Sequence, residues 1–372
     1  MRKISVLHIG KYYYPYRGGF EKSIYSLIAE LKSKLHFTIL VANTSCVTVV
    51  ENDADTTVIR LACLGRILSQ PIVPSLFIWL KKLRADIIHL HLQNPLAMFI
   101  YLCANPPGAL VISYHSDVVR QKWFMPFVNP FLKLTLKKAH TIVVTSENLI
   151  NSSPILNAFR EKCVVIPHGV DVNAFKVSPR IVGEAEKIKS SVDGKIVLFV
   201  GRLVYYKGLQ YLIDAMRDID ATLIVVGDGP LRASLQRAAR IRGVQHKIHW
   251  RGDVDDDALV AYYQACSVFV LPSCYNSESY GIVILEAHAL GKPVVSTDLT
   301  TGVTFTNLQH KTGLVVPVAN SRLLNEAINR LLGSKELCEQ YGKNGKERLL
   351  KEFTQEKMAQ KYLTLYNTIS NN

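Results

Sequence analysis

The sequence predicts an α/β fold of two doubly wound, Rossmann-like domains, each built on a parallel sheet and facing a central cleft. Three observations support this prediction. Short β-branched runs alternate with helical patterns along most of the chain, which is typical of parallel sheets wrapped by helices. The alternation occurs as two series, and a polar stretch lies between them. At 372 residues, the chain is also long for a single core.

The first series is predicted to form an N-terminal domain over residues 1–172. Its strands are expected in the apolar runs at 4–10, 37–42, 86–92, 109–115, 140–146 and 163–169. Helical patterns fall between these runs, at 20–33, 74–84 and 95–104. After Gly169 the sequence becomes polar and lacks runs typical of buried strands, so residues 173–194 are predicted to be a linker.

The second series is predicted to form a C-terminal domain over residues 195–352. Its strands are expected at 195–203, 221–229, 247–254, 267–273, 292–298 and 312–317. Residues 353–372 should form a last helix that could cross back to the first domain. Ligands of doubly wound sheets bind beyond the carboxyl ends of the strands, so two such domains in tandem imply a cleft between them.

Charge and composition indicate which classes of binding partner and which cellular compartment to expect. The chain has a net charge of +14, and its first 175 residues contain 19 Lys and Arg against 10 Asp and Glu. An anionic partner is therefore expected, whether nucleic acid, nucleotide or lipid surface. The seven scattered cysteines indicate a reducing compartment, and prolines interrupt the most apolar tracts. We expect a cytosolic protein that touches a membrane without crossing it.

The stretch 272–298 contains the strongest candidate site. A polar loop with Glu278 leads into a short helix with Glu286. The helix start offers backbone N–H groups of Ser279, Tyr280 and Gly281. Such a corner suits an anionic ligand with hydroxyls beside its charge, for example a phosphorylated sugar. The alternative is a capped core helix with two solvated glutamates.

Two loops of the second domain could bind phosphate or nucleotide. Arg202 ends a strand and Lys207 follows five residues later, so both cations could neutralise a leaving diphosphate. Gly229, in the GDGP turn after the next strand, could let the backbone pack around a base or ribose. A simple turn is the alternative there.

The first domain offers weaker candidates. Gly18 and Gly19 precede a helix, where a backbone can approach a phosphate closely. His115 ends a buried strand and could bond a sugar hydroxyl, although a structural role is the alternative. His89 and His91 share a strand face, but no third ligand is in view, so no metal site is expected.

Taken together, these segments resemble the retaining glycosyltransferases of GT-B fold, specifically their large fourth sequence family. The resemblance covers nearly the whole chain and includes the H-S-D segment, IPHGVD, GRLVYYKG, GDGP, SESYGIVILEA and GKPVVST. The most specific element is the pair Glu278 and Glu286, with seven residues between them. Tyr280 is a departure, because many members have phenylalanine there.

The resemblance implies a role for each candidate. Arg202 and Lys207 would hold the donor diphosphate and Glu286 the ribose, while Glu278 would contact the transferred sugar. The backbone groups of Tyr280 and Gly281 would help Glu278, His115 would line the sugar site, and Gly18 and Gly19 would admit phosphate and acceptor. The remaining implied donor-site residues are Gly18, Gly19, Gly229, Ser279, Tyr280 and Gly281. The family is metal-independent, so no cofactor is expected.

The resemblance further points to bacterial O-antigen or capsule synthesis. The donor would be GDP-mannose or a related GDP-sugar, with UDP-sugars next, and the acceptor a lipid-linked glycan. Cations and aromatics alternate over residues 120–140, as in a segment lying on an anionic leaflet, so we expect a peripheral protein on the inner face of the cytoplasmic membrane and no nucleic-acid partner. A helix packed on the sheet with a solvated basic edge is the alternative for that segment. Rival functions are a nucleotide-sugar 2-epimerase of the same fold and a non-catalytic binding module.

Overall fold

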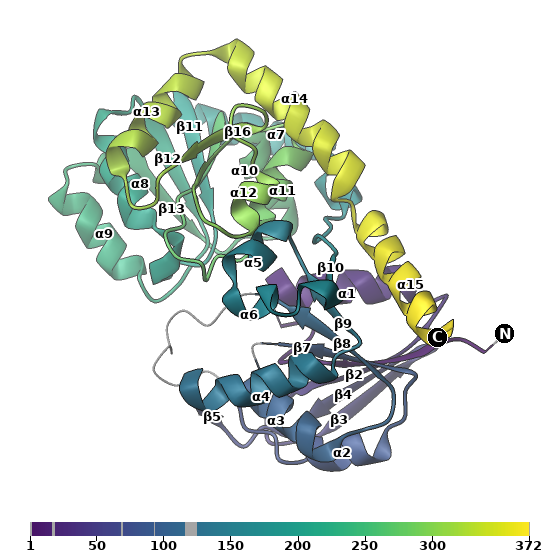
Figure 1. The fold of residues 1–372 in the computed structure, drawn as a ribbon. Coiled ribbons are helices and arrows are strands. Elements are labelled where there is room, and N and C mark those ends of the chain that lie inside the picture. The colour runs from purple at the N-terminus through teal and green to yellow at the C-terminus, as the bar shows by residue number, and fades with distance from the viewer. Residues whose placement is uncertain (1, 17–18, 68–69, 93, 116–124, 372) are drawn as a thin grey trace. The chain divides into compact units, whose positions relative to one another are not determined.

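The chain folds into two compact units, shown in Figure 1. The computed structural model describes residues 2–371 except 17–18, 68–69, 93 and 116–124. Unit 1 contains Met1–Gly169 and Gln355–Asn372, and unit 2 contains Val170–Thr354. Within the described residues, no helix is long and apolar enough to cross a membrane.

Unit 1 is built on an eight-stranded sheet in the order β10-β9-β8-β7-β1-β2-β4-β3. Its strands are β1 (Ser5–Ile9), β2 (His36–Ala42), β3 (Val49–Asp53), β4 (Thr56–Leu61), β7 (Ile87–His91), β8 (Ala109–Tyr114), β9 (Thr141–Val144) and β10 (Cys163–Val165). All pairs are parallel except β3–β4. A small hairpin joins β5 (Arg66–Ile67) to β6 (Gln70–Pro71).

Helices cover both faces of this sheet. Along β1, alternate side chains point to opposite faces, so Leu7 packs on one side and Val6 on the other. The Leu7 side is covered by α2 (Leu76–Lys82), α3 (Pro95–Ala104), α4 (Met125–Lys138), α5 (Glu147–Ser152) and α6 (Pro154–Asn157). The Val6 side is covered by α1 (Gly19–Leu31) and by the C-terminal helix α15 (Gln355–Asn371), which contact each other. Helix α15 therefore belongs to unit 1 although its sequence follows unit 2.

Unit 2 is built on a six-stranded, fully parallel sheet in the order β13-β12-β11-β14-β15-β16. Its strands are β11 (Lys195–Val200), β12 (Ala221–Val226), β13 (Ile248–Gly252), β14 (Val268–Leu271), β15 (Val294–Thr297) and β16 (Gly313–Val316). The chain progresses in one direction from β11 to β13 and in the other from β14 to β16. The switch point thus lies between β11 and β14, where such sheets bind ligands.

The helices of unit 2 lie on both faces of its sheet. They are α7 (Pro179–Ser190), α8 (Leu209–Ala215), α9 (Arg232–Ile241), α10 (Asp256–Ala265), α11 (Ile282–Ala289), α12 (Gly302–Thr306), α13 (Ser321–Leu332) and α14 (Lys335–Glu352). Helices α8, α9 and α13 contribute to the core on one face, and α7, α10 and α11 to the core on the other.

The linker expected at residues 173–194 is replaced in the structure by helix α7. Ser178 caps this helix by accepting a hydrogen bond from the backbone of Ile181, and Pro179 occupies its first position. Ile181 and Ala185 are buried, and the helix packs on α10. The sequence did not indicate this helix because α7 buries only a narrow stripe and most of its residues are exposed to solvent.

Candidate active site

The candidate site of unit 2 is centred on an ion pair between loops that follow two neighbouring strands. Lys207 ends the 3₁₀ turn Tyr205–Lys207 after β11, and Glu278 lies in the loop after β14. Lys207 Nζ is 2.5 Å from Glu278 Oε2, and each residue is only 8% exposed. The hydroxyl of Ser273 donates to the same carboxylate oxygen at 3.1 Å. The switch point therefore presents a buried, hydrogen-bonded charge pair.

The charge state of Lys207 follows from two opposing effects. Burial by itself lowers the pKa of Lys207, because an ammonium is poorly solvated there. The negative charge of the nearby Glu278 carboxylate, and that of Tyr206 when it is ionised, raise the pKa of Lys207. These effects outweigh burial, so the pKa of Lys207 lies above its usual value. Lys207 therefore stays an ammonium at neutral pH and can serve as a fixed positive charge.

Glycine allows the two loops to come this close. Gly208 follows Lys207 with φ of +66°, and a Cβ there would lie 2.0 Å from the carbonyl oxygen of Pro272. On the other side, the backbone N–H of Cys274 donates to the carbonyl of Tyr206 at 2.8 Å. The loop after β11 is thus held against the loop after β14, and this contact sets the position of Lys207.

Helix α11 begins directly beyond Glu278. Gly281 occupies its N-cap position with φ of +76°, a conformation that favours glycine. The preceding carbonyl groups are held in place, since Ser279 O accepts from the N–H of Gly302 at 2.8 Å and Tyr280 O accepts from the hydroxyl of Thr306 at 3.3 Å. The Tyr280 side chain is 2% exposed and lies in the core of unit 2. The side chain of Tyr280 is therefore part of the core, and it is the backbone of this residue that lies at the helix start.

Glu286 lies on α11 and is also buried. It is 9% exposed, and its Oε2 accepts a hydrogen bond from the hydroxyl of Tyr263 on α10 at 2.8 Å. Burial and the negative charge of Glu286 raise the pKa of Tyr263 well above its usual value, so this hydroxyl remains a donor. The alternative of two solvated glutamates is wrong, because both carboxylates are buried and hydrogen-bonded.

The remaining unit 2 candidates sit at the same edge of the sheet. Arg202 follows β11 and is exposed, so its guanidinium is accessible to a ligand. Gly229 follows β12 and packs on the loop after β11, where a Cβ would lie 2.5 Å from Leu203 O. Asp228 beside it accepts from Arg232 at 2.6 Å. Gly229 is thus required for a close backbone approach, whatever its ligand role.

The unit 1 candidates belong to the start of α1 and to the segment after β8. Gly18 lies outside the described residues, and Gly19 is the first residue of α1. His115 follows β8, with its ring stacked against His91 at 5.9 Å and against His168 at 6.1 Å. Burial, together with His168, lowers the pKa of His115 well below its usual value. A neutral imidazole at the carboxyl edge of the sheet fits a hydrogen-bonding role.

The structure adds a histidine that the sequence prediction missed. His8 of β1 is in register with His89 of β7, and His8 Nδ1 is 2.9 Å from His91 Nε2. One ring nitrogen from each of His8, His89 and His91 lies within 4.8 Å of the other two, a grouping able to hold a metal ion. The expectation that His89 and His91 lack a third partner is therefore wrong. The β1–β7 register that supplies it could not be read from sequence alone.

The surroundings of this cluster favour a structural role. His89 bonds the hydroxyl of Tyr366 on α15 at 2.6 Å and that of Ser113 at 2.8 Å, so both its nitrogens are engaged. Burial lowers the pKa of His8 to about 3, and its ring is bonded to His91. These contacts form a neutral, hydrogen-bonded core that ties helix α15 to the sheet.

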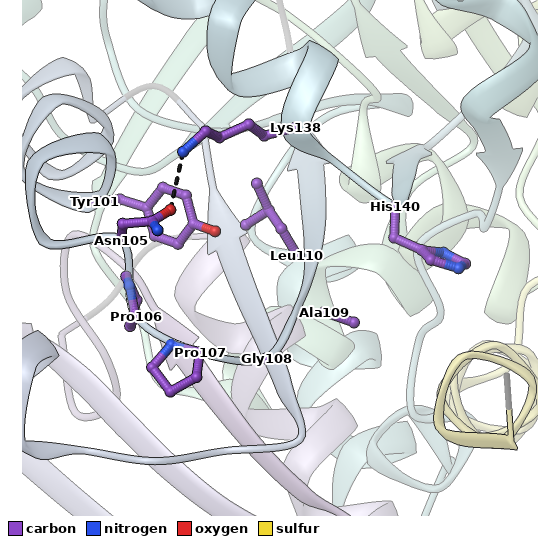
Figure 2. A pocket seen from close by; sticks show the side chains of 9 residues that line it. All are labelled: Tyr101, Asn105, Pro106, Pro107, Gly108, Ala109, Leu110, Lys138 and His140. Carbon is purple, nitrogen blue, oxygen red and sulfur yellow. Dashed lines mark hydrogen bonds between the residues drawn. The ribbon is translucent and has the colours of Figure 1, made fainter.

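A separate hollow lies in unit 1, at the end of the sheet opposite to the one where His115 follows β8. Its volume is about 510 Å³, and Asn105, Gly108, Lys138 and His140 contribute to its lining. Figure 2 shows Lys138 reaching over to Asn105, with a hydrogen bond of 2.9 Å, while the ring of His140 turns away from both. The hollow borders the amino end of β8, whereas parallel sheets bind ligands at their carboxyl ends. It is therefore not the candidate active site.

Comparison with known proteins identifies the family. Residues 184–348 match the glycosyl transferases group 1, and residues 17–174 match Glycosyltransferase Family 4. The O-antigen chain mannosyltransferase C of Escherichia coli is 32% identical over 370 residues, covering 98% of this chain and 99% of that protein. The chain belongs to glycosyltransferase family 4. It is also similar to the D-rhamnosyltransferase WbpZ of Pseudomonas aeruginosa, at 32% identity over 73% of this chain and 70% of that protein.

Solved structures share the fold of this glycosyltransferase. Sucrose-phosphate synthase from Thermosynechococcus elongatus superposes with a TM-score of 0.81 at 24% identity, covering 99% of both chains. The Anabaena protein HepE in complex with UDP superposes with a TM-score of 0.79 at 18% identity, covering 98% of this chain and all of the other. The predicted family, the GT-B fold class and the glycosyltransferase activity are confirmed.

Proposed function

We propose that this glycosyltransferase transfers a sugar, with retention of configuration and without a metal ion, from a nucleotide-sugar to a lipid-linked glycan in cell-surface polysaccharide synthesis. The observation that supports this most is the buried Lys207–Glu278 pair at the switch point of unit 2, next to the start of α11. In this pair, Lys207 offers a fixed positive charge for a diphosphate, and Glu278 beside it offers a fixed carboxylate for sugar hydroxyls.

Each residue of the site has a distinct task in this proposal. Lys207 and the exposed Arg202 neutralise the negative charge that develops on the leaving diphosphate, which is the task a metal ion performs in other transferases. Glu278 accepts hydrogen bonds from the transferred sugar, and Glu286, oriented by Tyr263, accepts them from the ribose. The N-terminus of α11 faces the phosphates with its positive dipole end.

The transfer step balances without a side-chain nucleophile. The acceptor oxygen forms its bond to the anomeric carbon on the face from which the diphosphate oxygen departs. The acceptor proton passes to that departing phosphate oxygen, and the nucleoside diphosphate leaves. Glu278 is engaged by Lys207 and Ser273, which suits it to positioning the sugar rather than attacking it.

GDP-mannose or a related GDP-sugar is the favoured donor, with a UDP-sugar next. Names of relatives support this choice: one is an O-antigen chain mannosyltransferase, and another, from Mycobacterium tuberculosis, is a GDP-mannose-dependent phosphatidylinositol monomannoside mannosyltransferase, 30% identical over 233 residues. The second of these names also supports a lipid-linked acceptor. We place the enzyme in the cytoplasm, at the inner face of the cytoplasmic membrane.

A ligand panel followed by a transfer assay tests the proposal. The melting temperature should rise with GDP and GDP-mannose more than with UDP or UDP-glucose, because a ligand that binds the native state stabilises it. The shift and the later transfer rate should be unchanged by a chelator. Product analysis by NMR should show the donor's anomeric configuration. An inverted product or chelator-sensitive transfer would contradict the mechanism, and a UDP-only response would contradict the donor.

A further inference from the structure

We propose that an aromatic face on helices α3 and α4 docks the enzyme on an anionic lipid bilayer. This aromatic face consists of Phe99, Phe127, Phe131 and Leu134, which are 46%, 68%, 40% and 47% exposed. The inference rests on the proposed lipid-linked acceptor and names the surface that meets the lipid.

Helix α4 has two apolar sides, and in the described part of the chain one of them packs on the core of unit 1. Leu132 and Leu136 are buried in the core of unit 1. Phe127, Phe131 and Leu134 follow the spacing i, i+4 and i+7, so they share a second side, which is exposed. A helix that packs only on a sheet normally has polar residues on its outer side, so the core does not account for these three side chains.

Helix α3 extends the same face. It packs against α4, and the ring of Phe99 meets that of Phe131 edge-on, with centroids 5.4 Å apart. On the other side of α3, helix α2 packs against it and exposes Phe77 and Ile78. Figure 1 shows α2, α3 and α4 lying on the same side of the sheet. The apolar side chains therefore come from neighbouring helices and are not isolated exceptions.

The charges around the aromatic face indicate which kind of partner it binds. Lys133 and Lys137 are exposed on α4, and neither α3 nor α4 contains an acidic residue. Lys81 and Lys82 are exposed on α2, which also lacks acidic residues. Aromatic rings settle at the headgroup level of a bilayer, and lysines near an anionic surface are attracted to it. Aromatic and basic groups without acidic ones thus fit an anionic leaflet.

Vesicle flotation tests the inference with the full chain and without donor or acceptor. The wild type should float with vesicles of phosphatidylcholine mixed with phosphatidylglycerol, and not with phosphatidylcholine alone. Phe127→Ser/Phe131→Ser should weaken binding at least about tenfold, since it removes two apolar rings that the proposal buries in the interface. Lys133→Glu/Lys137→Glu should weaken it to a similar extent and reduce its salt dependence.

Ile241→Ser is the matched control, because Ile241 is a 77% exposed apolar residue on α9 of unit 2. Its binding should equal that of the wild type. Unchanged melting temperatures would show that the variants fold. Equal flotation of the Phe127→Ser/Phe131→Ser variant and the wild type would overturn the inference, as would self-association through this face without vesicle binding. Transfer that fails while flotation behaves as expected would instead count against the proposed function alone.

Discussion

Lys207 and Glu278 form a 2.5 Å ion pair between the loops after β11 and β14, with both side chains withdrawn from solvent. Removing two charges from water is unfavourable, and the mutual attraction must offset that cost. Two apolar residues would hold the loops together at least as well. We therefore infer that the pair serves catalysis rather than stability. Mutations can separate its effect on the free energy of unfolding from its effect on transfer.

The variant Glu278→Leu should destabilise the protein and stop transfer. It leaves the Lys207 ammonium buried without its partner, which typically lowers the free energy of unfolding by about 3–5 kcal/mol. The double variant Lys207→Met/Glu278→Leu should recover most of that stability, since neither side chain is then charged. Both should lose at least about 100-fold in turnover, because the charges at the reacting centre are gone. Denaturant unfolding and a transfer assay on the same preparations measure the two effects. A double variant that is no more stable than the single one would contradict this account.

The variant Tyr263→Phe should weaken nucleotide binding without changing the fold. It removes one hydroxyl that donates to Glu286 at 2.8 Å and leaves the ring in place. Losing one hydrogen bond to a buried charge costs about 1–2 kcal/mol, so the Kd of the nucleoside diphosphate should rise about 5- to 30-fold. Titration calorimetry measures it, and Glu286→Ala should be at least as severe. An unaltered Kd in both variants would remove Glu286 from the ribose contact.

Local sequence pattern predicted most of the sheet strands and the glutamate pair, because each of these features depends only on a short contiguous stretch of sequence. Strands β11, β12 and β14 are continuous apolar runs, as buried parallel strands require. Strand β3 was missed because all five of its residues are exposed, which leaves no apolar alternation to detect. Helix α7 was missed because its buried stripe is narrow.

Long-range geometry accounts for the rest. The contact of Lys207 with Glu278 joins residues 71 positions apart, and their burial depends on the order of strands in the sheet. His8 meets His91 only because β1 lies beside β7. No pattern within either segment contains that information.

The variant Gly208→Ala should damage the site through the backbone. Its Cβ would lie 2.0 Å from Pro272 O, and φ of +66° is strained for alanine. The loop must shift, which should lower stability by several kcal/mol and misplace Lys207. Gly194→Ala is the matched control, since φ there is +75° but nothing lies within 4 Å of the added Cβ. Its cost should be only about 1 kcal/mol, with transfer unaffected. Equal effects of the two variants on transfer would show that the close contact with Pro272 does not determine the position of Lys207.

Stability should fall on mild acidification because of the buried histidines of unit 1. Burial lowers the pKa of His8 to about 3 and that of His168 to about 4, from the usual 6.5. The unfolded chain then binds protons below about pH 6.5 that the native state rejects, so stability is complete above that pH and is lost as pH falls through it. Each such group contributes about 1.4 kcal/mol per pH unit in this window.

The variant His168→Asn isolates one of these contributions. Asparagine can still bond the hydroxyl of Ser23, which His168 Nδ1 meets at 2.8 Å, but it does not titrate. Urea unfolding across the window should therefore show a pH slope smaller than wild type by about 1.4 kcal/mol per pH unit. His246→Asn, the same substitution at an exposed position of unit 2, is the matched control for folding and for the measurement. A wild-type stability that is flat between pH 7 and pH 5 would mean that the native state accommodates these protons. The histidines would then not be the neutral core that holds α15 to the sheet.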